Sequence, residues 1–188
     1  MSQMKQYLYF VCTFLFTSIV LMGCKLTPTK GKTISAFQDK NIKFDTDSML
    51  VVKSTSNNYD RNFKFAFVMY VDSTSCSKCI LNELDKWSLY LNEMPEGILT
   101  FYPIFTPAKC DRREFFYKCR SLTLPYPVYI DTLGTLVREN PILNIIGGAN
   151  VFLIDSGGKV LLIGNPTKNP DVRKTVDRIF TNNRICIK

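Results

Sequence analysis

The segment VDSTSCSKCIL, residues 71–81, places two cysteines, Cys76 and Cys79, two residues apart. Three interpretations of such a pair are open: a redox-active dithiol, part of a metal site, or two sulfurs with no chemical role. The sequence around the pair has to distinguish them.

The residues on either side predict a strand followed by a helix. Residues 63–72 (FKFAFVMYVD) are rich in aromatic and β-branched side chains without alternation, which indicates a strand buried on both faces. Residues 73–75 (STS) are all able to cap a helix. Apolar side chains then recur at i, i+4, i+7 and i+11, in Ile80, Leu84, Trp87 and Leu91, and residues 94–97 (MPEG) end the helix. The cysteines are therefore expected at the helix N-terminus, directly after a central strand.

The rest of the chain continues the alternation of strands and helices. Upstream, two short strands, Asn41–Phe44 and Met49–Lys53, are expected around a turn at Asp45–Ser48. Downstream, the sequence predicts strands at 98–105 and 126–131, a basic helix between Cys110 and Cys119, an ambiguous segment at 132–146, a hairpin of 151–155 and 159–166, and a helix from Pro170 to about Phe180. This order predicts an α/β fold with a central sheet covered by helices on both faces.

The N-terminus predicts a targeting segment. Residues 7–23 form an apolar stretch after Lys5, and Leu21-Met22-Gly23-Cys24 resembles the lipobox of bacterial lipoproteins. The resemblance implies cleavage before Cys24 and lipidation of its sulfur. The chain then divides into a signal peptide (1–23), a lipidated tether (24–40) and a folded domain (41–188). An uncleaved membrane anchor is the alternative, and either places the domain in the bacterial cell envelope, facing the periplasm or the cell surface.

Composition excludes several kinds of site. The 188 residues include no histidine, which removes Cys–His and Ser–His nucleophilic pairs and histidine-rich metal sites. The formal net charge is +8, but the basic residues are mostly scattered, so nucleic acid is not expected as a partner.

Cysteine usage leaves some pairings open. Of seven cysteines, Cys12 would leave with the signal peptide and Cys24 would carry lipid, so the domain keeps an odd number. In an unbroken helix Cys110 and Cys119 would be roughly 13.5 Å apart, too far for a disulfide. They are either two ordinary cysteines or a pair in a broken helix, and Cys186 is open.

A buried strand, a C-x-x-C motif at a helix N-terminus and the hairpin VFLIDSGGKVLLIGNP (151–166) together resemble a thioredoxin-like domain. The likeness covers residues 40–185 and is to lipid-anchored or secreted bacterial proteins of the TlpA and alkyl-hydroperoxide-reductase/thiol-specific-antioxidant superfamily. It implies a central mixed sheet flanked by helices, with an N-terminal β extension. The chain departs from this pattern in two ways: Ser75 precedes Cys76 where tryptophan is common, and Ala149-Asn150 stand where Pro-Thr is usual.

The resemblance implies a membrane-anchored thiol–disulfide oxidoreductase without a cofactor. Cys76 would be the nucleophile and Cys79 the resolving cysteine, because a helix N-terminus favours the thiolate. Lys78 would add a further cation or would simply be solvated. The expected partners are a protein thiol or disulfide substrate, a redox partner and the membrane. The alternatives are a non-catalytic binding lipoprotein with a structural disulfide and, with less support, a metal-handling protein.

Overall fold

The central strand of the sheet, β2, forms from the apolar run that precedes the cysteines. The computed structural model describes residues 40–43, 45–52, 63–95, 97–146 and 149–183, all within the unit Ile34–Lys188. Every residue of β2 (Phe65–Val71) is buried, which confirms the predicted strand with two covered faces. The other elements are β1 (Leu50–Val52), α3 (Ser77–Leu81), α4 (Leu84–Asn92), β3 (Leu99–Phe105), α5 (Arg112–Ser121), β4 (Val128–Ile130), α6 (Thr135–Glu139), α7 (Leu143–Ile146), β5 (Ala149–Asp155), β6 (Val160–Ile163) and α8 (Pro170–Asn182).

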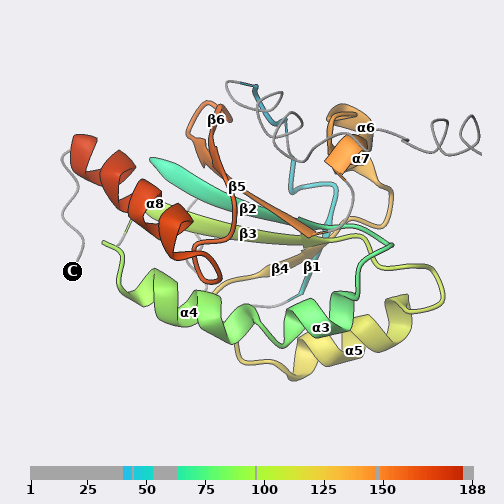
Figure 1. Cartoon of the computed structure of the whole chain (residues 1–188). Coiled ribbons are helices and arrows are strands. Elements are labelled where there is room, and N and C mark those ends of the chain that lie inside the picture. The colour runs from blue at the N-terminus through green and yellow to red at the C-terminus, as the bar shows by residue number, and fades with distance from the viewer. Residues whose placement is uncertain (1–39, 44, 53–62, 96, 147–148, 184–188) are drawn as a thin grey trace, which may run out of the picture. The chain divides into compact units, whose positions relative to one another are not determined.

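The strands form one mixed sheet in the order β1-β4-β3-β2-β5-β6. β2 pairs parallel with β3 and antiparallel with β5, while β5 and β6 form an antiparallel hairpin. Figure 1 shows α3, α4 and α5 below the sheet and α6 and α7 above it. The carboxyl ends of β2, β3 and β4 lead directly into α3, the segment before α5 and the segment before α6.

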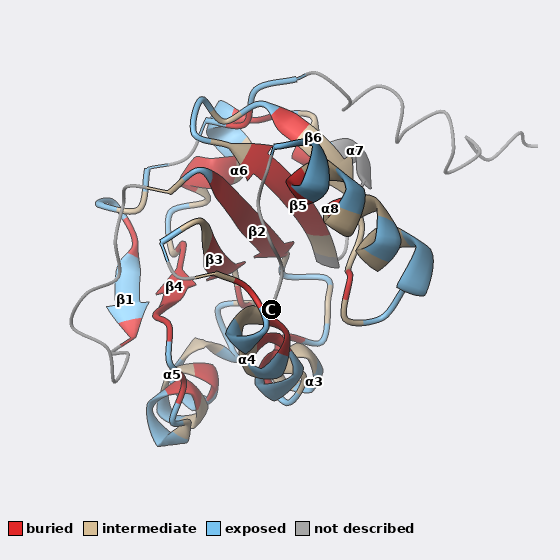
Figure 2. Cartoon of the chain, turned by 90° about the vertical axis from the view of Figure 1, so that its left-hand side faces the viewer, coloured by how far each residue is buried: buried red, intermediate tan, exposed pale blue. Residues whose placement is uncertain are grey.

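Two apolar clusters hold the layers together. The larger cluster joins one face of β2 and β3 to α4, α5 and α8, with Trp87 stacked on Phe101 at 4.2 Å between ring centroids. The smaller cluster lies on the opposite face of the sheet and contains Ile42, Met49 and Leu136. Figure 2 shows the result: the strands are largely buried, and the helices expose their outer sides.

The N-terminal β extension pairs at both edges of the sheet. Asn41 forms a bridge with Lys159 at the β6 edge, whereas β1 pairs antiparallel with β4 at the opposite edge. The predicted strand at 49–53 is present as β1, whereas of the predicted strand at 41–44 only the isolated bridge at Asn41 is present among the described residues. Between the two edges, Asn140 at the end of α6 binds both backbone groups of Lys43, with Lys43 N donating to Asn140 Oδ1 at 2.8 Å. Ile42 and Met49 are both buried on the sheet.

The helix after the cysteines is divided. The predicted apolar stripe is present, but α3 ends at Leu81 and α4 begins at Leu84. Glu83 N donates to Ile80 O at 2.9 Å, an i→i+3 bond that tightens the chain between the two helices. Leu81 ends α3 and Leu84 begins α4, and both are fully buried, so the division keeps both leucines against the core.

The predicted C-terminal hairpin is confirmed, with a glycine that its geometry requires. Asp155 Oδ1 accepts hydrogen bonds from Gly157 N and Lys159 N at 2.9 and 3.0 Å. Gly158 has a φ of +81°, and a Cβ there would lie 2.7 Å from the carbonyl oxygen of Ile42. Only glycine fits both the turn and this close approach of the backbone.

The ambiguous segment at 132–146 forms the two short helices α6 and α7, and the last helix, α8, is capped by Asn169 as its Pro170 start suggests. No helix in the described ranges is long and apolar enough to cross a membrane. The predicted signal peptide, Cys24 and Cys186 all lie outside the described residues.

Candidate active site

The turn that carries the cysteines is organised by Asp72, the first residue after β2. Its Oδ1 accepts four hydrogen bonds, from the backbone and hydroxyl groups of Thr74 at 3.0 and 2.7 Å and from those of Ser75 at 3.1 Å each. Ser75 N also donates to the carbonyl of Asp72 at 3.2 Å. None of the three predicted capping residues caps the helix. Their hydroxyl-bearing segment instead forms a turn that delivers Cys76 to the start of α3.

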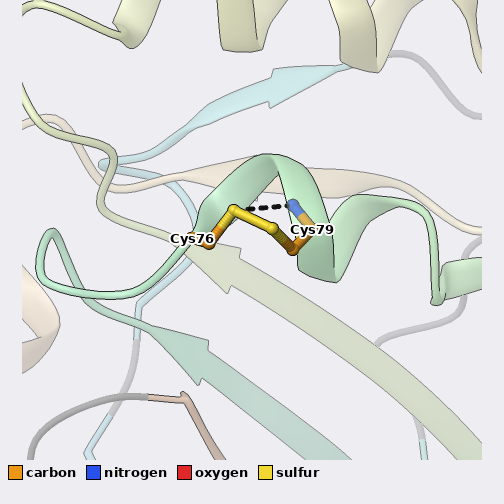
Figure 3. The surroundings of a disulfide bond; sticks show 2 residues. All are labelled: Cys76 and Cys79. Carbon is orange, nitrogen blue, oxygen red and sulfur yellow. Dashed lines mark hydrogen bonds between the residues drawn. A yellow bond between two sulfur atoms is a disulfide. The ribbon is translucent and has the colours of Figure 1, made fainter.

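Cys76 and Cys79 form a disulfide, with 5.3 Å between their Cα atoms. Cys76 is the N-cap residue of α3, and Cys79 N donates a hydrogen bond to Cys76 Sγ at 3.2 Å (Figure 3). Both cysteines are solvent-exposed, while Ser77 between them is buried at 8% relative exposure. Burial of Ser77 turns the two sulfurs outward, where a partner thiol can reach them.

The ammonium group of Lys78, between the two cysteines in sequence, is part of an ion pair. Lys78 lies between the two cysteines, and its ammonium forms an ion pair with the Glu114 carboxylate of α5. The hydrogen bond from Lys78 to Glu114 raises the pKa of Lys78. Lys78 is therefore bound to a neighbouring helix, an interaction that the sequence alone did not reveal. The ion pair also joins α3 to the first turn of α5.

Two further groups lie at the carboxyl end of the sheet. Asp131 follows β4, is fully buried, and accepts hydrogen bonds from Thr135 N and Leu136 N at 3.0 and 2.9 Å. It therefore caps α6. Tyr70 lies in β2, and burial raises the pKa of its phenol.

A hydrophobicity pattern could not single out Asp72, Glu114 or Asp131. For Asp72 a signal was available, because Asp followed two residues later by Thr74 matches the spacing of an Asx turn.

Ala149-Asn150, the residues predicted to stand where Pro-Thr is usual, begin β5. Ala149 is the first residue of β5 and pairs with Val71, the last residue of β2, from which the cysteine-bearing turn departs. Asn150 pairs with Tyr70. The segment that usually carries proline therefore lies beside the end of the central strand.

The remaining described cysteines are not part of the disulfide. Cys110 is exposed in the turn before α5, and Cys119 is buried within that helix. The helix is unbroken between Arg112 and Ser121, so the interpretation of two ordinary cysteines is confirmed. Burial raises the pKa of Cys119 to about 12, which makes it a poor nucleophile. Among the described residues no group of three or more metal-ligating side chains is present.

The central βαβ unit, the β5–β6 hairpin with its following helix, and a C-x-x-C disulfide directly after the central strand define a thioredoxin-like fold. No family model and no curated protein sequence matches the chain.

Several solved structures are similar to it. The thioredoxin domain of a thiol-disulfide oxidoreductase from Bacteroides vulgatus has 15% sequence identity and a TM-score of 0.46, covering 76% of this chain and 96% of that one. An exposed lipoprotein thioredoxin from Streptococcus pneumoniae has 17% identity and a TM-score of 0.43, with coverage of 62% and 87%. StoA from Bacillus subtilis has 18% identity and a TM-score of 0.41, with coverage of 62% and 86%.

Proposed function

We propose that the protein is a thiol–disulfide oxidoreductase whose reactive group is the Cys76–Cys79 pair. The observation that carries the proposal is the exposure of both sulfurs at the start of a helix, directly after the central strand. Structural disulfides are usually protected from exchange, whereas exposed disulfides are the labile ones. Exposure distinguishes this pair from Cys119, which is buried and forms no disulfide.

The local geometry supports Cys76 as the nucleophile. In the reduced protein the hydrogen bond from Cys79 N stabilises a thiolate at Cys76 Sγ more than it stabilises a thiol. Cys79 lies one turn further along α3 and is held within bonding reach by the same turn. The chain therefore has an attacking sulfur and a resolving sulfur on one short helix.

The exchange runs in two balanced steps. The Cys76 thiolate attacks one sulfur of a substrate disulfide, and the other substrate sulfur leaves as a thiolate and takes up a proton. Cys79 then loses its proton and attacks Cys76 Sγ, which releases the second substrate thiol and closes the Cys76–Cys79 bond. The substrate gains the electron pair that the protein dithiol loses, and the reverse sequence oxidises a substrate.

The expected partners are a protein thiol or disulfide and a second redox protein that regenerates the pair. We also propose that the domain works in the cell envelope, attached through lipid on Cys24 after removal of residues 1–23. The lipobox-like sequence at 21–24 supports this location. Incorporation of labelled palmitate in cells, lost on Cys24→Ser, tests the anchor separately from the redox chemistry.

Insulin reduction with dithiothreitol as electron donor tests the reaction. The wild type is expected to accelerate precipitation of the insulin B chain, and Cys76→Ser is expected to abolish the acceleration. Cys79→Ser should instead accumulate a mixed disulfide through Cys76, visible by mass spectrometry under non-reducing conditions. Cys119→Ser is the matched control and should keep activity. A wild type that does not accelerate precipitation would show that the pair is a structural disulfide of a binding module. Activity that survives Cys76→Ser would show that this pair does not carry the reaction.

A further inference from the structure

An apolar groove lies between the edge strand β1 and helix α5. Its floor and walls are formed by Leu50 of β1, Ile130 of β4, and Phe116 and Tyr117 of α5, and its volume is about 440 Å³. Leu50 and Tyr117 are 53% and 58% exposed. Large apolar and aromatic side chains that remain this exposed on one surface are typical of protein-binding sites.

The strand beside this groove is the edge strand of the described sheet. β1 is the last strand on its side of the sheet and pairs only with β4 among the strands that the structure describes. Its central residue, Val51, is 55% exposed. An edge strand of this kind presents backbone N–H and C=O groups to which an extended peptide can add as a further strand.

Two arginines at the start of α5 give the groove a positive charge. Arg112 Nη2 donates to the carbonyl of Thr132 at 3.1 Å, and its Nε donates to the carbonyl of Pro107 at 3.4 Å. Arg113 stacks over the Tyr117 ring at 5.9 Å from its centroid. In the described part of the chain neither guanidinium forms an ion pair with a carboxylate. Arg112 is thus held in place by neutral carbonyls and keeps its full charge and further donors for a ligand.

We propose that this β1–α5 groove (Leu50, Ile130, Phe116, Tyr117, Arg112 and Arg113) binds an extended acidic segment of a partner protein. The segment pairs with the free edge of β1, places an apolar side chain in the groove, and brings carboxylates to the two arginines. Charge complementarity selects an acidic segment, and the strand edge selects an extended one. A flat lipid surface would satisfy the arginines but would leave the directed backbone groups of β1 without partners.

The site is separate from the disulfide and does not depend on the proposed redox function. Its probe is a phage library displaying random 12-residue peptides, selected on the oxidised protein. We expect the enriched peptides to combine an apolar or aromatic residue with flanking Asp or Glu. The dissociation constant of the most enriched peptide, made with a fluorescent label, is then measured by anisotropy against variants.

Arg112→Glu with Arg113→Glu is expected to weaken peptide binding at least tenfold, because two attractive charges become repulsive. Arg113→Glu alone, which breaks no described hydrogen bond, should weaken it several-fold, and Leu50→Asp should do the same. Lys118→Glu is the matched control for Arg113→Glu, since it makes the same charge change on α5 outside the residues that line the groove, and it should alter binding less than twofold. Trp87 fluorescence verifies that each variant is folded.

Three results would overturn the proposal. The first is a selection that enriches no acidic peptides. The second is an acidic peptide that binds Arg113→Glu as tightly as the wild type. The third is stronger, Arg112- and Arg113-dependent binding to vesicles of anionic phospholipid than to any selected peptide, which would assign the groove to a membrane.

Discussion

Replacing Asp72 with alanine removes the acceptor that shapes the turn between β2 and the disulfide. Of the four hydrogen bonds to Asp72 Oδ1, two come from hydroxyl groups, which can turn to water when the acceptor is lost. The other two come from Thr74 N and Ser75 N, at 3.0 and 3.1 Å. Ser75 N also donates to the backbone carbonyl of Asp72 at 3.2 Å and keeps that acceptor in the variant, whereas Thr74 N loses the acceptor described for it. Each backbone bond to a partly exposed carboxylate contributes about 1 kcal/mol. With one of these bonds lost and the other partly replaced, we expect Asp72→Ala to lower the free energy of unfolding by about 1–2 kcal/mol.

Urea unfolding of the oxidised protein measures this change. The single tryptophan, Trp87, is 1% exposed and stacked on Phe101, so its fluorescence reports loss of the core. For a domain of this size, a loss of about 1–2 kcal/mol corresponds to a fall in Tm of about 2–8 °C. Asp72→Asn keeps a side-chain oxygen as acceptor and should lose less than half as much stability.

Hydrogen exchange localises the effect. Asp72→Ala should accelerate exchange of the amides of Thr74 and Ser75. The matched control Asp155→Ala, which removes the equivalent acceptor from the β5–β6 turn, should accelerate exchange only at that turn. If Asp72→Ala unfolds within about 0.5 kcal/mol of the wild type and its amide exchange is unchanged, the role assigned to this carboxylate is wrong.

Three further predictions concern the buried groups. At pH 8 iodoacetamide should modify the exposed Cys110 readily. It should modify Cys119 about a thousandfold more slowly than a thiol of ordinary pKa, because a pKa of about 12 leaves almost no thiolate. Peptide mass spectrometry measures both rates, and comparable rates would contradict the burial of Cys119. Asp131→Ala leaves two buried N–H groups at the start of α6 without an acceptor and should cost about 2–4 kcal/mol in urea unfolding, whereas a cost below 1 kcal/mol would show that this cap is dispensable. Tyr126→Phe removes the hydroxyl that donates to the Leu84 carbonyl at 2.5 Å and should cost about 1 kcal/mol, and an unchanged urea midpoint would refute the contribution of this bond.

Patterns along the chain predicted the central elements of the fold. The apolar density of 63–72 predicted β2, and the Ser-Gly-Gly turn predicted the β5–β6 hairpin, because each depends on residues close together in the sequence. The cysteine spacing alone left three interpretations open, and the strand, the helix and the hairpin around it favoured the redox pair that forms the Cys76–Cys79 disulfide. Each of these features is formed by residues close together in the sequence, so a short sequence pattern is enough to predict it.

The sequence did not predict features that depend on distant partners. The pairing of Asn41 with Lys159 and of β1 with β4 joins residues far apart in the sequence, and Ile42 and Met49 are buried in the smaller apolar cluster. The ion pair of Lys78 with Glu114 joins residues 36 positions apart, so no sequence window could contain it. The division of the helix before Leu84 was also missed, since the apolar spacing is nearly the same with or without it.

The reduction potential of the Cys76–Cys79 pair tests the central claim most directly. The purified domain is equilibrated with a series of glutathione or dithiothreitol redox buffers, and the fraction of oxidised protein is measured by mass spectrometry after alkylation. Because both sulfurs are exposed and the bond lies at a helix start, we expect a reversible two-electron couple with a potential above about −300 mV. A potential below that value, or a pair that does not re-form its disulfide after reduction, would contradict a role in thiol–disulfide exchange.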